Sequence, residues 1–352
     1  MTIGEKIQKY RKELGMSQED LGQKLLLSRQ TISFWEKDQT VPTLDNLMRL
    51  KEILGVTVDE LLSADDKTQA TKNKSSLDSI CATLAYAMGI DPPKYAAQQN
   101  WDLATYIDKK LEKKRADRVV MYNPDAIAQW IYQKYPNFFD DVKKHTDVEI
   151  PLAAVMPSVT PVCFGTMYTG AQPEVHGIQK YEKPVITIDT LFDAMLRAGK
   201  KVALITYGNC SLSRIFLERD LDYFHFEQGD IDAVNAKAVE VILQDEHDLI
   251  VIYNGNYDSV MHKMGPEGAQ ALGELRANCH VFSLICELIE ANWKHHNTLV
   301  GFAMDHGCHE IDGGCGSHGL DMAEDINIVH LYKCYLAKED RYASICDQTR
   351  RE

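Results

Sequence analysis

The chain has 352 residues, of which 45% are hydrophobic and 26% are charged, values that are ordinary for a folded protein with two or three domains. They exclude a single small module, a fully disordered chain and a fibrous repeat. The net charge of −14 repels a phosphate backbone, so any contact with nucleic acid must be local.

The sequence carries no signal for a membrane or for secretion. No run approaches 18 consecutive apolar residues, and the first 15 residues are polar and amphipathic, unlike a signal peptide. The nine cysteines lack the close, regular spacing of a secreted disulfide framework, which predicts reduced thiols. We therefore expect a cytoplasmic protein that does not bind a membrane.

Residues 1–64 are predicted to form a compact all-helical domain. Apolar residues recur at helical spacing over residues 3–14. Ser17 and Ser28 are typical N-caps of two further helices, and a fourth helix is expected to begin at Thr43. A last helical turn follows before the polar, aperiodic residues 65–76, which are typical of a linker.

Within this domain, residues 16–36 place two short helices around a tight turn. The residues that carry the pattern are Gln18, Leu21, Ser28, Ile32, Ser33, Trp35 and Glu36. Residues 2–63 thereby resemble the phage-repressor type of helix-turn-helix protein, the xenobiotic-response-element family of bacterial regulators. In that family the helix that begins at Ser28 enters the major groove.

The resemblance implies sequence-specific DNA binding by residues 1–64 and a homodimer on palindromic sites. The polar face of the second helix consists of Arg29, Gln30, Thr31 and Ser33, and Arg or Gln can make bidentate contacts to base edges. The first 63 residues contain nine basic and ten acidic side chains. Because this module is nearly neutral, we expect weak non-specific affinity for DNA.

The rest of the chain predicts a second architecture. A helical lead-in over residues 77–115 is followed by residues 116–352, where short apolar runs alternate with helices, one of them over 189–198 with Asp189 as N-cap. The expected strands are residues 119–122, 201–207, 249–253 and 299–304. Such alternation predicts an α/β domain with a mostly parallel sheet flanked by helices. Ligands of these folds bind beyond the carboxyl ends of the strands.

Acidic residues, histidines and a hydroxyl follow these predicted strands. Asp125 follows the first run, Asp258 and His262 follow the third, Asp305 and His306 end the fourth, His318 lies beyond a glycine-rich turn, and Thr160 lies in a proline-flanked turn. Carboxylates with imidazoles suit divalent zinc or manganese. Two ions about 4 Å apart can clamp the oxygens of a phosphoryl displacement, and coordination activates a threonine hydroxyl as nucleophile.

Residues 116–335 resemble the alkaline phosphatase superfamily, in particular its nucleotide pyrophosphatase/phosphodiesterase branch. The matching strings are Thr160, Thr169-Gly170, Pro173, His176-Gly177-Ile178, Asp258 to Pro266 and Asp305-His306-Gly307. The resemblance implies an alkaline phosphatase-like fold and hydrolysis of a phosphodiester or phosphomonoester in a small phosphorylated or nucleotide-like substrate. It also implies that Thr160 is the nucleophile.

The same resemblance assigns two divalent ions, zinc or alternatively manganese. Asp258, His262 and His318 would hold one, and Asp125, Asp305, His306 and the Thr160 oxygen the other. Two ligands have competitors: Asn123 for Asp125, because the family's glycine after the first Asp is missing here, and His309 for His318. His318 follows His306 by 12 residues, so the family's long capping insertion is absent.

Other residues of this region have simpler interpretations. Ser158 is the alternative nucleophile, His176 is expected to pack rather than to contact substrate, and Cys308 and Cys315 are not expected to ligate zinc. The main prediction is a metal-dependent phosphoester hydrolase fused to a DNA-binding module. The alternative is a transcriptional regulator whose phosphatase-like domain senses a phosphorylated or nucleotide ligand with little turnover.

Overall fold

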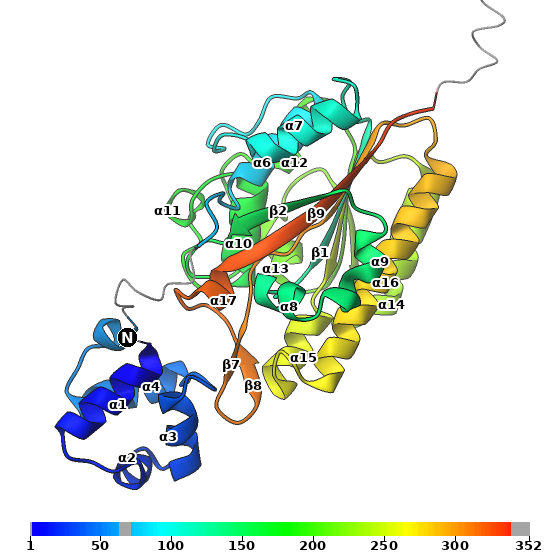
Figure 1. The fold of residues 1–352 in the computed structure, drawn as a ribbon. Coiled ribbons are helices and arrows are strands. Elements are labelled where there is room, and N and C mark those ends of the chain that lie inside the picture. The colour runs from blue at the N-terminus through cyan, green and yellow to red at the C-terminus, as the bar shows by residue number, and fades with distance from the viewer. Residues whose placement is uncertain (1, 63–71, 339–352) are drawn as a thin grey trace, which may run out of the picture.

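The computed structural model describes residues 2–62 and 72–338, and it begins with a helical unit (Figure 1). Its helices are α1 (Ile3–Glu13), α2 (Gln18–Leu25), α3 (Arg29–Glu36), α4 (Leu44–Leu54) and α5 (Val58–Leu62). Ser17 caps α2 in a reciprocal arrangement with Asp20, and Ser28 caps α3. Their apolar faces enclose a separate core that includes Ile32 and Trp35. The predicted helical domain is confirmed.

A buried ion pair fixes the first three helices of this unit. Arg11 of α1 donates to both carboxylate oxygens of Glu36 in α3, with Nη2 2.9 Å from Oε2. Gln8 and Gln18 donate to the same carboxylate. The Glu36 carboxylate is buried, but all of these donors bond to it. The pair therefore holds the helices together without leaving an unpaired buried charge.

The second unit is built on a seven-stranded sheet in the order β2-β9-β6-β1-β5-β3-β4. Only β9 runs against its neighbours, so the predicted mostly parallel sheet is confirmed. The strands are β1 (Arg118–Pro124), β2 (Val148–Ala153), β3 (Val202–Tyr207), β4 (Asp222–Phe226), β5 (Leu249–Asn254), β6 (Thr298–Phe302) and β9 (Asn327–Tyr335).

Helices cover both faces of this sheet (Figure 1). One face carries α9 (Asp140–Lys143), α14 (Ile231–Gln244) and α16 (Ala269–Asn292), and the other carries α6 (Ser79–Met88), α7 (Trp101–Lys110), α10 (Thr160–Thr169) and α12 (Leu191–Arg197). The shorter elements are α8 (Gln129–Lys134), the 3-10 turn Pro136–Phe139, α11 (Pro173–His176), α13 (Ser211–Ile215), α15 (Asn256–Met264) and α17 (Ala323–Ile326).

Two features differ from the sequence expectations. The N-cap of α12 is Thr190, in a reciprocal arrangement with Asp193, whereas Asp189 pairs with Arg197. Residues 65–71 of the predicted linker lie outside the described residues, but the carbonyl of Ser75 accepts from Ala153, so the end of that stretch lies along the edge strand β2. The predicted helical lead-in packs into the main core through α6 and α7.

A short hairpin, β7 (His309–Ile311) with β8 (Cys315–Ser317), projects from the carboxyl end of the sheet toward the helical unit (Figure 1). Its tip lies beside the segment between α3 and α4, where Val41 forms a β-bridge with Ile311. Within residues 2–62 and 72–338, no helix combines the length and apolar character needed to cross a membrane.

Candidate active site

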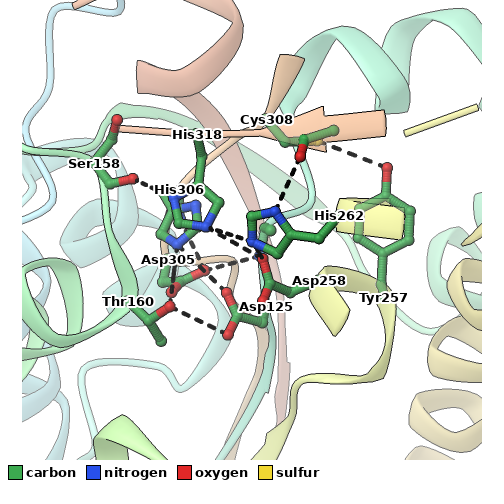
Figure 2. A network of polar contacts seen from close by, with 12 residues as sticks. Asp125, Ser158, Thr160, Tyr257, Asp258, His262, Asp305, His306, Cys308 and His318 are labelled. Atoms are coloured by element: carbon green, nitrogen blue, oxygen red, sulfur yellow. Dashed lines mark hydrogen bonds and ion pairs between the residues drawn. The ribbon is translucent and has the colours of Figure 1, made fainter. Parts of the chain in front are cut away.

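The polar residues predicted for the site meet beyond the carboxyl ends of the central strands (Figure 2). Asp125 follows β1, Asp258 and His262 lie on α15 after β5, and Asp305 and His306 follow β6. Thr160 is the first residue of α10, and His318 follows β8 directly. Segments from five parts of the chain therefore converge because parallel strands end at one edge of the sheet.

The first group, which we call the outer cluster, consists of Asp258, His262 and His318. Asp258 Oδ1 lies 3.2 Å from His262 Nε2 and 3.3 Å from His318 Nε2. The two Nε2 atoms are 3.2 Å apart. The side chain of His262 is 40% exposed, so this group is open to solvent on one side.

The second group, the inner cluster, consists of Asp125, Asp305 and His306 and is fully buried. His306 Nε2 lies 3.4 Å from Asp125 Oδ1 and 3.4 Å from Asp305 Oδ2. Thr160 Oγ1 belongs to the same group of atoms, 3.4 Å from Asp125 Oδ2 and 3.4 Å from His306 Nε2. The threonine hydroxyl is thus held against a carboxylate and an imidazole.

The three histidines share one orientation that fixes their tautomer. In each ring Nδ1 faces a backbone carbonyl: that of Gly316 for His262 at 3.0 Å, that of Ser158 for His318 at 3.0 Å, and that of Gly307 for His306 at 2.9 Å. A carbonyl can only accept, so Nδ1 carries the proton and Nε2 of the neutral ring keeps its lone pair. Histidines that ligate metals are oriented in this way by their surroundings.

Two oxygens of the inner cluster are left without hydrogen bonds. Asp125 Oδ1 and Asp305 Oδ2 are buried, and among the described residues neither accepts a hydrogen bond. Burial raises the pKa of Asp125 well above its usual range, and the neighbouring Asp305 and Asp258 add to this rise. Burial likewise raises the pKa of Asp305 to about 7. Unpaired buried carboxylates are costly unless a cation compensates them.

The outer cluster is electrostatically different. Burial acts to raise the pKa of Asp258, but the rings of His262 and His318 lower that pKa overall. Asp258 in turn raises the pKa of His262 to about 9. A metal ion bound here would take the place of a proton on the imidazole.

The donor atoms fit divalent ions by their chemistry and their spacing. Zinc bonds of about 2.0–2.1 Å in a tetrahedral arrangement separate neighbouring ligand atoms by about 3.3–3.4 Å. The separations of 3.2–3.4 Å in both clusters match this value. Each cluster could therefore hold one metal ion.

Tyr253 is a part of this site that the sequence analysis did not single out. It is the residue before the last of β5, is buried, and donates its hydroxyl proton to Asp125 Oδ2. Its ring packs against Tyr207, with centroids 5.4 Å apart. A tyrosine near the end of an apolar strand is usually a core residue, so the sequence carried no indication of the hydrogen bond to Asp125.

The two competing ligands lie elsewhere. Asn123 is buried, donates to the carbonyl of Ala303 at 2.8 Å and accepts from Tyr168 at 2.6 Å. His309 is buried and pairs through Nδ1 with Asp325 at 2.7 Å. Both side chains are engaged with protein partners and belong to neither cluster.

The remaining candidates divide as follows. His176 packs on Gly165 and bonds to Thr166 at 3.0 Å, and burial lowers its pKa to about 4, which agrees with the expected packing role. The hydroxyl of Ser158 is buried near the site, and its carbonyl orients His318. Burial raises the pKa of the Cys308 thiol well above its usual value. Cys315 contacts the carbonyl of Lys263 instead of a cluster.

The residues predicted to contact DNA lie on α3. Arg29 and Gln30 are exposed in its first turn, and Thr31 and Ser33 are half-buried. The backbone amide of Thr31 donates to Ser28 Oγ at 3.1 Å, and this bond caps the helix. The opposite face of α3 packs into the core of the helical unit, so the polar face points outward.

Comparison with known proteins shows that the first unit is similar to helix-turn-helix proteins. Residues 7–61 match the helix-turn-helix family. The chain is 35% identical over 82 residues to the HTH-type transcriptional activator BcrR of Enterococcus faecalis, covering 23% of this chain and 40% of that protein. It is 35% identical over 71 residues to the HTH-type transcriptional regulator DicA of Escherichia coli, covering 20% of this chain and 53% of that protein. These matches span less than two thirds of either relative.

The second unit is similar in fold to murine ectonucleotide pyrophosphatase/phosphodiesterase 5. That similarity has a TM-score of 0.50 at 14% identity and covers 66% of this chain and 94% of the murine chain. It concerns the fold, and it agrees with the family resemblance predicted for residues 116–335. The chain therefore joins an N-terminal helix-turn-helix domain to an α/β unit with the fold of a nucleotide pyrophosphatase/phosphodiesterase.

Proposed function

We propose that this protein is a metal-dependent phosphoester hydrolase, with Thr160 as nucleophile, fused to a sequence-specific DNA-binding module. The observation that carries the proposal is the position of Thr160 Oγ1, 3.4 Å from both Asp125 Oδ2 and His306 Nε2. Because Thr160 begins α10, its hydroxyl also lies at the partially positive end of a helix, which favours an anionic substrate.

The ligands proposed for the two ions follow the clusters. Asp258, His262 and His318 would hold one, and Asp125, Asp305 and His306 with the Thr160 oxygen would hold the other. Zinc is the proposed metal, because imidazole and carboxylate donors at these separations suit it, and manganese is the alternative. When bound, the ions neutralise phosphate charge and lower the pKa of the threonine hydroxyl.

The chain's own groups supply the covalent chemistry. Thr160 Oγ loses its proton to solvent and attacks phosphorus, and the bond from phosphorus to the leaving oxygen breaks, so that phosphothreonine forms. The leaving oxygen takes a proton from water. A second water then attacks phosphorus, which restores the Thr160 hydroxyl and releases phosphate or a phosphomonoester. Tyr253 keeps Asp125 oriented throughout by its hydrogen bond.

The nucleophile is tested by a pair of matched variants. Thr160→Ala should reduce hydrolysis of p-nitrophenyl phosphate and bis(p-nitrophenyl) phosphate to the background rate, whereas Ser158→Ala should retain it. Zinc content is measured for both variants, because loss of the ions would also abolish turnover. Wild-type turnover by a zinc-loaded Thr160→Ala protein would overturn the assignment.

The DNA-binding half of the proposal rests on the exposed face of α3. Arg29, Gln30, Thr31 and Ser33 would read base edges, and two copies of the chain would bind a palindromic site. A duplex selected from a random library provides the probe. Replacing Arg29 and Gln30 by Ala should abolish its gel shift, and Lys144→Ala, which removes a charge outside the domain, should not. Sedimentation of the full chain with the duplex tests the dimer.

A second candidate is a regulator that senses a phosphorylated or nucleotide ligand with little turnover. The contact between the hairpin tip and the helix-turn-helix domain favours it, since Val41 bonds to Glu310 across the two units. A zinc-loaded protein that binds nucleoside monophosphate and changes its DNA affinity, but hydrolyses neither aryl phosphate, would support this candidate over the enzyme.

A further inference from the structure

The β7–β8 hairpin connects the two clusters to the DNA-binding domain. Asp305 and His306 of the inner cluster precede β7, and His318 of the outer cluster follows β8 directly. Both ends of the hairpin therefore carry candidate metal ligands. Its tip reaches the helix-turn-helix domain (Figure 1), so one short element contacts both functional units.

The tip makes specific contacts beside the recognition helix. The amide of Val41, shortly after α3, donates to the carbonyl of Glu310 at 3.3 Å. The side chain of Asn46 in the first turn of α4 donates to Asp312 Oδ2 at 2.9 Å. Asn46 is buried and the Asp312 carboxyl is half-buried, so these groups are enclosed by the contact.

These contacts place the negative charge of Asp312 in the region that the phosphates of bound DNA would occupy. The N-terminus of a helix favours anions such as phosphate, and at α4 this position is taken by the Asp312 carboxylate. A major groove about 12 Å wide has phosphates on both sides of an inserted helix. Segments next to α3 must therefore approach the backbone of the duplex, and the Asp312 carboxylate beside α4 repels it.

The other end of the hairpin is locked to the outer cluster. The carbonyl of Gly316 in β8 accepts from His262 Nδ1 at 3.0 Å. A Cβ on Gly316 would meet the sulfur of Met261 and lie 2.8 Å from its carbonyl oxygen, so β8 lies directly against α15. With the hairpin in this position, the ligand atoms of Asp258, His262 and His318 already have the spacing that suits an ion.

We propose that the β7–β8 hairpin inhibits DNA binding, and that a metal ion in the outer cluster stabilises this inhibited arrangement. The inference rests on the proposed metal and DNA binding, and adds that the two oppose each other. An ion that joins His318 to α15 favours the docked hairpin, because in this arrangement the ligand atoms already have the spacing that suits the ion. By linkage, DNA binding must weaken metal binding by the same factor.

The test measures the affinity of the full-length chain for a duplex at constant ionic strength. The duplex is selected from a random library with metal-free wild type and, in parallel, with Asp312→Ala. Each protein is titrated metal-free and after loading with Zn²⁺, and bound zinc is counted. We expect zinc to weaken binding by wild type at least fivefold, which is about the lower limit of typical allosteric couplings.

Three variants separate the parts of the argument. Asp312→Ala should bind the duplex tightly with or without zinc, and Asp258→Asn should lose the zinc response because the outer cluster is broken. Asp45→Ala is the matched control: it removes the same charge from α4, next to Asn46, but Asp45 pairs with Arg49 rather than with the hairpin. In Asp45→Ala, the ratio of the duplex affinities with and without zinc should equal that of wild type.

Hydrogen exchange gives a readout that does not depend on DNA. Zinc should slow exchange of the Val41 amide in wild type and leave it unchanged in Asp258→Asn. If zinc and duplex both bind but the two affinities agree, or zinc tightens DNA binding, this inference is wrong while the proposed function stands. If every variant fails to bind zinc, or every variant fails to bind any duplex, the proposed function fails as well.

Discussion

The inner cluster predicts a substitution whose effect on stability changes sign when metal is added. Asp305 is completely buried, and its Oδ1 accepts from the amides of Ala126 at 3.1 Å and His306 at 2.9 Å. Its Oδ2 accepts no hydrogen bond from any described residue. Asp305→Asn keeps the shape and the Oδ1 bonds but removes the charge. Without metal it should therefore stabilise the fold.

The magnitude follows from the pKa of this carboxyl. Burial raises the pKa of Asp305 from 3.8 to about 7, so the folded state holds the proton more tightly than the unfolded state. The metal-free protein therefore loses stability as the pH rises from about 4 to about 7. At pH 8 the cost reaches at most about 4 kcal/mol, at 1.36 kcal/mol for each unit of pKa. Asp305→Asn should recover a large part of it.

Zinc should reverse the order of the two proteins. Zinc at about 10,000 times the Kd of the inner cluster adds about 5.5 kcal/mol to a protein that binds it only when folded. This gain is larger than the free energy that Asp305→Asn recovers, and Asp305→Asn should lose it. Urea unfolding at pH 8, with chelator and with zinc, measures the difference in unfolding free energy between Asp305→Asn and wild type under each condition.

The matched control is Asp325→Asn. Asp325 is equally buried, but its oxygens are paired with His309 and with the amide of Leu320. This substitution should destabilise the protein by a similar amount with and without zinc. If Asp305→Asn destabilises the metal-free protein as Asp325→Asn does, the carboxylates of the inner cluster are not held as uncompensated charges.

Three further predictions concern single contacts. Tyr253→Phe removes the hydroxyl that orients Asp125 and should weaken zinc binding by about 10- to 100-fold, measured by competition with a chelator, with DNA affinity at low zinc unchanged. Arg11→Met leaves Glu36 buried without its charge partner, which should cost about 3–5 kcal/mol and lower the melting temperature of the helix-turn-helix domain. Replacing Glu36 by Leu as well should restore most of it. His330 is buried and its pKa is lowered to about 4, so the unfolded state takes up a proton near pH 6.5 and the folded state does not. The contribution of His330 to stability, measured as the difference between wild type and His330→Gln, should fall by about 3 kcal/mol between pH 6.5 and pH 4. A difference that is constant over this range would contradict the burial argument.

The sequence predicted the strands that are buried on both faces. The runs that became β1, β3, β5 and β6 are almost continuously apolar, because parallel strands inside a sheet have no polar face. The edge strands β2 and β4 alternate or include charged residues, and they were missed. β9 was missed because it carries His330 and Lys333, although His330 is buried and bonds to the carbonyl of Met304 at 2.6 Å.

The candidate site was predictable where its residues are local in sequence. Asp258 and His262 are one helical turn apart, and Asp305 and His306 are adjacent, so spacing alone places each pair together. Contacts between distant segments left no such trace: Tyr253 reaches Asp125 only because β5 lies beside β1. The buried pair of Arg11 with Glu36 likewise joins two helices whose separate patterns predict only amphipathic faces.

The short spacing between His306 and His318 shows most clearly what the structure adds. From the sequence alone, the spacing of 12 residues between the two histidines indicates only that the capping insertion of the family is absent. In the structure these residues form the β7–β8 hairpin, whose turn includes Gly313 with a positive φ. With a connection of this length, the side chain of His262 is 40% exposed, so the outer cluster is open to solvent on that side. The same hairpin contacts Val41 of the helix-turn-helix unit through Ile311. The feature that opens the site is therefore also the one that connects it to the DNA-binding domain.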